Sequence, residues 1–92
     1  MKHSRIHIVA YGAVQGVGFR AWARGAARRL ELCGRVWNRG DGAVEMEAAG
    51  PADALRRWQD LVHAGPPGGR VDRVEELPPG WEALPCPFDI TY

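Results

Sequence analysis

Residues 5–20 read RIHIVAYGAVQGVGFR, and this stretch decides the fold. Its first seven residues alternate in side-chain character and are rich in β-branched types, which predicts a strand over residues 5–11. Three glycines among the next seven residues indicate a loop over residues 12–18, because no regular element favours so many. From Phe19 apolar residues recur at helical spacing, which predicts an amphipathic helix that ends near Leu32.

Two further strands are expected after this helix, over residues 34–39 and 43–49. The Asp41-Gly42 pair between them favours a hairpin, because glycine tolerates the positive φ that such a turn requires. In the second of these strands Glu45 and Glu47 point away from the apolar side chains. We therefore expect their face of the sheet to be solvated.

The rest of the chain predicts one more helix and two more strands. Gly50-Pro51 opens the helix, and the Gly/Pro-rich segment after residue 64 ends it. The later elements are a strand, a proline-rich loop and a short final strand, over residues 70–77, 78–87 and 88–92.

Strand, helix, strand, strand, helix, strand and a short terminal strand follow one another in this order. This βαββαβ pattern predicts an α+β fold, a ferredoxin-like split βαβ sandwich, as a single domain over residues 1–92. Right-handed crossovers would place both helices on one face of an antiparallel sheet.

Composition excludes several classes of protein. The chain is 46% hydrophobic and 25% charged, with a net charge of +1, which is typical of a globular domain and gives no global attraction to nucleic acid or anionic membranes. Because no apolar run is long enough to span a membrane, we expect a cytoplasmic location. We also expect a monomer. Cys33 and Cys86 lack metal or redox spacing; two reduced thiols are the expectation, and one disulfide is the alternative.

The glycine loop is the best candidate for a binding site. It lies between a strand and the start of a helix, where the first backbone N–H groups have no partner within the helix and the helix dipole is positive. Such a place binds a phosphate-sized anion. Arg20, in the first helical turn, adds a planar fork of donors.

Asn38 is the second candidate. In a split βαβ fold its strand runs parallel to the first strand, so its C-terminal end lies at the same edge of the sheet as the glycine loop. Asn38 is therefore expected to approach Arg20, although in isolation it would be read as an ordinary turn residue.

The two segments together resemble the acylphosphatase family. The family signature, Gly-x-Val-Gln-Gly-Val-x-Phe-Arg followed by Gly-x-Val-x-Asn-x-x-Asp-Gly, is matched at every defined position by residues 12–20 and 34–42. The main departures are Trp37, where a basic residue is common, and the proline-rich loop that contains Cys86.

The resemblance implies an enzyme that converts a small acyl phosphate and water into a carboxylate and inorganic phosphate, without metal or other cofactor. It implies that Arg20 binds the phosphoryl group and that Asn38 orients the attacking water. The phosphate would lie in a cradle of loop N–H groups, contributed by Gln15, Gly16, Val17, Gly18, Phe19 and Arg20.

Two other functions stay open at this point. One is a ferredoxin-like nucleic-acid-binding module, against which the near-neutral charge and the lack of an interleaved aromatic and basic strand motif both count. The other is a non-catalytic or accessory domain that binds acyl or carbamoyl phosphate; acylphosphatase-like domains also occur inside hydrogenase maturation proteins.

Overall fold

A computed structural model describes residues 3–92, so the first two residues of the predicted domain lie outside the described part. Five strands and two helices follow one another along it in the order that the sequence predicts. Their bounds are β1 (His3–Ala13), α1 (Phe19–Arg29), β2 (Cys33–Asn38), β3 (Val44–Pro51), α2 (Ala52–Ala64), β4 (Arg70–Leu77) and β5 (Asp89–Ile90).

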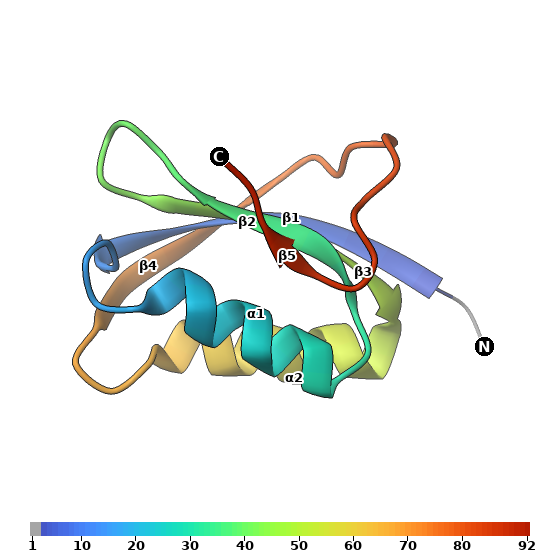
Figure 1. Ribbon diagram of the computed structural model, residues 1–92, viewed down its shortest axis with the longest axis horizontal. Coiled ribbons are helices and arrows are strands. Elements are labelled where there is room, and N and C mark those ends of the chain that lie inside the picture. The colour runs from blue at the N-terminus through green and yellow to red at the C-terminus, as the bar shows by residue number, and fades with distance from the viewer. Residues whose placement is uncertain (1–2) are drawn as a thin grey trace.

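The strands form one sheet in the order β4-β1-β3-β2-β5, and both helices pack on the same face of it (Figure 1). β3 lies between β1 and β2 and is antiparallel to each. β1 and β2 therefore run in the same direction, as a split βαβ fold requires. The predicted ferredoxin-like architecture is confirmed.

The core lies between the sheet and the two helices. Phe19 and Trp58 contribute from the helices, Ile8 and Met46 from the sheet, and Phe88 from the segment before β5; all are fully buried. The Trp58 indole donates a hydrogen bond to the Ala23 carbonyl at 3.1 Å, which links the two helices and satisfies the polar end of that ring. Leu61 falls at helical spacing with Leu55, Trp58 and Val62, yet it is exposed whereas those three are buried.

Two element boundaries next to the glycine loop and before β2 differ clearly from the prediction. β1 continues through Gly12 and Ala13, after a register shift at Tyr11 that lets the chain pass close to Arg70. α1 ends at Arg29 rather than near Leu32, because Glu31 adopts a left-handed φ of 58° that turns the chain into β2.

The sheet is mixed, whereas the order of elements in the sequence predicts an antiparallel one. β5 pairs with β2 in parallel, with Arg35 opposite Asp89 and Val36 opposite Ile90. The loop over residues 78–87 carries the chain across the sheet before this strand, so β5 starts from the same end as β2. The final strand is also shorter than predicted.

The expectation that Glu45 and Glu47 would share a solvated face is wrong for Glu47, which is only 3% exposed. Its carboxylate lies between the guanidinium groups of Arg5 and Arg35. Residues 78–87 cross the sheet face opposite the helices (Figure 1), and Gly80 lies against this carboxylate. Alternation along β3 places Glu47 on that face correctly but carries no information about the loop that covers it.

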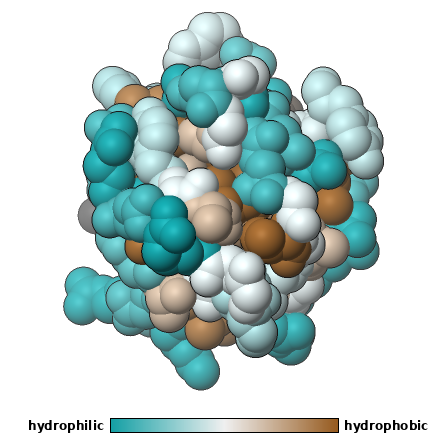
Figure 2. Space-filling model, turned by 90° about the vertical axis from the view of Figure 1, so that its left-hand side faces the viewer, coloured by the Kyte–Doolittle hydropathy of each residue, from teal (hydrophilic) through white to brown (hydrophobic). Residues whose placement is uncertain are grey.

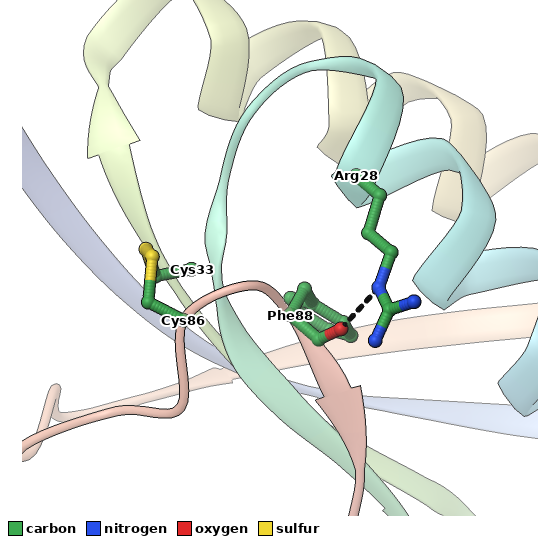
Figure 3. The surroundings of a disulfide bond; sticks show 4 residues. All are labelled: Arg28, Cys33, Cys86 and Phe88. Atoms are coloured by element: carbon green, nitrogen blue, oxygen red, sulfur yellow. Dashed lines mark hydrogen bonds between the residues drawn. A yellow bond between two sulfur atoms is a disulfide. The ribbon is translucent and has the colours of Figure 1, made fainter.

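The expectation of two reduced thiols is also wrong, because Cys33 and Cys86 form a disulfide (Figure 3). The returning C-terminal segment brings Cys86 to the start of β2, where the Gly34 N–H donates to the Pro85 carbonyl at 2.8 Å. The two cysteines are 53 positions apart, and the Cα–Cα distance of 4.6 Å exists only in the folded chain.

Neither helix within residues 3–92 has the length and hydropathy needed to cross a membrane.

Candidate active site

The C-terminal ends of β1 and β2 meet at one end of the molecule. Asn38 is opposite Val44 of β3, and Val44 is in turn opposite Ala10 of β1, so Asn38 is level with the last part of β1. The glycine loop leaves β1 at this end, beside the β2–β3 turn (Figure 1). The predicted proximity of the two segments is therefore present.

The glycine loop takes a conformation that suits its composition. Gly16 and Gly18 both have φ of 77°, in the left-handed region, and a Cβ at either position would meet nothing within 4 Å. Glycine is thus favoured at these two positions by the backbone conformation and not by a lack of space for a side chain. Gly18 is the residue that caps α1, and the first turn of α1 contains no acidic side chain. The helix N-terminus consequently keeps its positive character facing the loop.

A pocket of about 170 Å³ lies where these elements converge. Arg20 and Asn38 both line it, and so do the loop residues Gly16 and Gly18 and the first residue of α1, Phe19. Figure 2 views this end of the molecule, where hydrophobic surface near the centre is framed by hydrophilic groups. A guanidinium, a carboxamide and a helix N-terminus therefore border one small space, which suits an anion with a small apolar substituent.

Two of the predicted phosphate-binding residues turn their side chains elsewhere. The Gln15 carboxamide donates hydrogen bonds to the Arg39 and Ala43 carbonyls of the β2–β3 turn. The Val17 side chain lies next to Gly69, against the loop that follows α2. Only the backbone N–H groups of these two residues remain as candidates for the cradle.

Ile90 lines the pocket together with Ala21 and Val14, although its sequence pattern does not indicate a site residue. Ile90 belongs to β5 and reaches the pocket because β5 lies beside β2. The alternation of Phe88 and Ile90 was the available signal, but it indicated only a strand. The ring of Tyr92, two residues later, has its centre 5.5 Å from the Arg20 guanidinium.

Polar contacts hold β5 against α1. The Asp89 carboxylate lies 3.5 Å from Arg24 and 3.6 Å from Arg28. A hydrogen bond from the Ile90 N–H lowers the pKa of Asp89, and the two arginines lower it further. Arg28 also donates to the Phe88 carbonyl at 2.7 Å (Figure 3). These contacts fix the wall of the pocket that Ile90 contributes.

A larger and more open groove, of about 650 Å³, lies between α1 and α2. Its charged residues, Arg29, Arg57 and Asp60, are of both signs, and Leu61 lies among them. Because Arg20, Asn38 and the N-terminus of α1 all border the smaller pocket, we place the candidate active site there despite its size.

Comparison with known proteins shows which family the chain belongs to. A family model described as Acylphosphatase matches residues 6–80. An acylphosphatase from Salinibacter ruber is 52% identical over 64 residues, which cover 70% of this chain and 67% of the relative. An acylphosphatase from Acidovorax sp. is 50% identical over 80% of this chain and 72% of its own length.

Solved structures agree with the sequence relatives. The crystal structure of acylphosphatase from Bacillus subtilis superimposes with a TM-score of 0.88 at 35% identity, covering 99% of this chain and all of the other. An acylphosphatase structure from Coxiella burnetii gives a TM-score of 0.82 at 33% identity, with coverage of 97% and 93%. From its sequence and its fold, the chain is an enzyme that belongs to the acylphosphatase family.

Proposed function

We propose that this chain hydrolyses the carboxyl–phosphate anhydride of small acyl phosphates by in-line attack of water at phosphorus. Arg20 and the N–H groups of residues 15–20 hold the phosphoryl group, and Asn38 orients the water. The observation that carries the proposal is the single small pocket that Arg20, Asn38 and the glycine loop line together.

Hydrolysis of an acyl phosphate requires few catalytic groups from the protein. The leaving group is a carboxylate, a weak base with a pKa near about 4, so it departs without a general acid. Negative charge on the phosphoryl oxygens has to be stabilised and the water has to be aligned. A guanidinium and a helix N-terminus serve the first need. The Asn38 carboxamide, which lines the same pocket, serves the second, and the substrate's own phosphoryl oxygen takes the proton from the water.

The pocket also fits the size of the substrate. Its volume of about 170 Å³ accommodates a phosphoryl group and part of a small acyl group. Ile90 provides apolar surface for the acyl part. We further propose that the chain acts as a cytoplasmic monomer without cofactor or nucleic-acid partner.

The proposal is tested by hydrolysis of benzoyl phosphate by the purified protein. Arg20→Gln should raise KM and lower kcat, because it removes the charge that binds phosphate in both ground and transition states. Asn38→Ala should lower kcat about 100- to 1,000-fold while changing KM little, as loss of a preorganised polar group does in other enzymes.

Matched controls come from α2, away from the pocket. Arg56→Gln and Gln59→Ala make comparable changes on that helix and should leave kcat and KM unchanged. Wild-type turnover by Asn38→Ala would overturn the assigned role of Asn38. Phosphate binding without hydrolysis of any acyl phosphate would favour the non-catalytic domain, and a salt-dependent RNA shift without hydrolysis would favour the nucleic-acid module.

A further inference from the structure

We propose that the side chain of Gln15 is a positioning residue that sets Asn38 at the correct distance from the phosphate cradle. It acts through the backbone of the β2–β3 turn and does not contact the substrate. This inference rests on the function proposed above, since it concerns the geometry of the same pocket.

The side-chain amide of Gln15 connects the glycine loop to the β2–β3 turn. Its Nε2 donates to the Arg39 carbonyl at 2.7 Å and to the Ala43 carbonyl at 2.9 Å. Both distances are within the ordinary range for N–H···O hydrogen bonds, and together the two bonds use both protons of the amide. The side chain is partly buried, so solvent competes only weakly for these bonds.

The two acceptors stand at opposite ends of the same turn. The Arg39 N–H donates to the Ala43 carbonyl at 2.8 Å, which closes the turn. The Asp41 carboxylate accepts from the Ala43 N–H at 3.1 Å, which sets the turn's own conformation. Gln15 adds what these local contacts lack, namely a link from the turn to the glycine loop.

Asn38 depends on that link. It is the last residue of β2, it is exposed, and strand pairing holds it only on the side of Val44. The peptide that joins Asn38 to Arg39 leads directly to the carbonyl that Gln15 binds. The glycine loop, meanwhile, contains Gln15 and Gly16 next to each other, so the phosphate cradle and the anchor of the turn are adjacent in the chain.

A shift of Asn38 would impair the alignment of water more than the binding of phosphate. Displacement of a catalytic group by about 1 Å costs on the order of 100-fold in rate, because the reacting atoms lose their line of approach. The backbone N–H groups of the loop and Arg20 would still bind the anion. Loss of the Gln15 amide should therefore separate turnover from phosphate affinity.

The first test compares Gln15→Met with the wild-type protein, since methionine matches the length of glutamine without its hydrogen-bond donors. We expect kcat for benzoyl phosphate to fall about 10- to 100-fold, with the inhibition constant of inorganic phosphate unchanged. Trp58→Phe is the control, because it also removes a side-chain hydrogen bond to a backbone carbonyl, but between the helices. It should leave kcat unchanged.

A second variant covers the case in which Gln15→Met does not fold. Gln15→Glu keeps the shape of the side chain but points a charged acceptor at two carbonyls at neutral pH. We expect low kcat at pH 7 and partial recovery as the pH falls, because the protonated acid can donate one hydrogen bond. A pH profile identical to that of the wild-type protein would contradict the proposal.

A double-mutant cycle with Asn38→Ala decides the mechanism. If Gln15 acts through Asn38, Gln15→Met should have no further effect on kcat in the Asn38→Ala background. An equal loss in both backgrounds, or a change in phosphate inhibition without a change in kcat, would overturn the inference. If Asn38→Ala itself keeps wild-type turnover, the proposed function fails with it, whereas normal turnover in Gln15→Met alone refutes only the role of Gln15.

Discussion

Arg35 donates two hydrogen bonds to the carboxylate of Glu47, from Nε at 3.0 Å and from Nη2 at 2.6 Å, both to Oε1. The other carboxylate oxygen, Oε2, accepts from Arg5 at 3.2 Å. Arg5 also donates to the Glu82 carbonyl of the covering loop. One buried acid thus ties β1, β2 and β3 to the segment that leads into β5 and the pocket.

Replacement of Glu47 by glutamine should destabilise the protein. Burial raises the pKa of Glu47, but the hydrogen bonds from Arg35 and Arg5 outweigh burial and hold it below its ordinary value. Glu47→Gln should lower the free energy of unfolding by about 1–3 kcal/mol at pH 7, because two guanidinium groups lose their charged acceptor. Urea denaturation followed by tryptophan fluorescence measures the change.

The same ion pairs predict how the effect depends on pH. Since the pKa of Glu47 is lower in the folded state, its contribution is fully present above the pKa of the unfolded chain, near about 4.3, and is lost as the pH falls through the folded value. The difference between Glu47→Gln and the wild-type protein should therefore shrink at acidic pH. Glu76→Gln, at an exposed position of β4, is the control; a pH-independent difference for Glu47→Gln would contradict the argument.

Reduction of the Cys33–Cys86 disulfide should also lower stability. The bond closes a loop of 53 positions, for which restriction of the unfolded chain is worth about 2–4 kcal/mol. Cys86 is exposed and accessible to reductant. We expect dithiothreitol to lower the urea midpoint of the wild-type protein. The double variant Cys33→Ser/Cys86→Ser should have the lower midpoint already and not respond to reductant, and equal midpoints with and without dithiothreitol in the wild-type protein would refute the prediction.

Gly34 allows the C-terminal segment to approach β2. Its φ is 152°, and a Cβ there would lie 2.0 Å from the Glu47 carbonyl oxygen and 2.8 Å from the Phe88 ring. Gly34→Ala should destabilise the fold by about 3 kcal/mol, from overpacking and backbone strain together. Gly40→Ala is the matched control, because a Cβ at that position meets nothing within 4 Å. Thermal unfolding of the two variants compares them, and similar melting temperatures would show that Gly34 is not constrained.

Ile90 should influence which acyl phosphates are used. It presents apolar surface to the pocket, and the phosphoryl group is fixed by the loop in the proposed function, so Ile90 is left to contact the acyl group. Ile90→Ala should reduce kcat/KM for benzoyl phosphate about 10-fold and that for acetyl phosphate much less, because the smaller acyl group loses fewer contacts. Ile6→Ala, which trims a partly buried residue of β1, should not change the ratio of the two substrates. An unchanged ratio in Ile90→Ala would show that the acyl group lies elsewhere.

Local patterns in the sequence determined the order of the elements, the two-layer architecture and the pairing of the glycine loop with Asn38. These features depend on periodicity and glycine content within short windows and on the handedness of βαβ connections, all of which can be read along the chain. Arg20 and Asn38 line the same pocket because β1 and β2 run in the same direction and end at the same edge of the sheet, while the roles of the two residues stay predictions.

Only the tertiary structure decided what the C-terminal segment does. The parallel pairing of β5, the burial of Glu47, the disulfide and the place of Ile90 in the pocket all follow from the path of residues 78–92 across the sheet. The target of the Gln15 amide was likewise not visible, since both acceptors are backbone carbonyls more than twenty positions away. Contacts between distant segments depend on how the whole chain packs, and no local pattern of residue types records them.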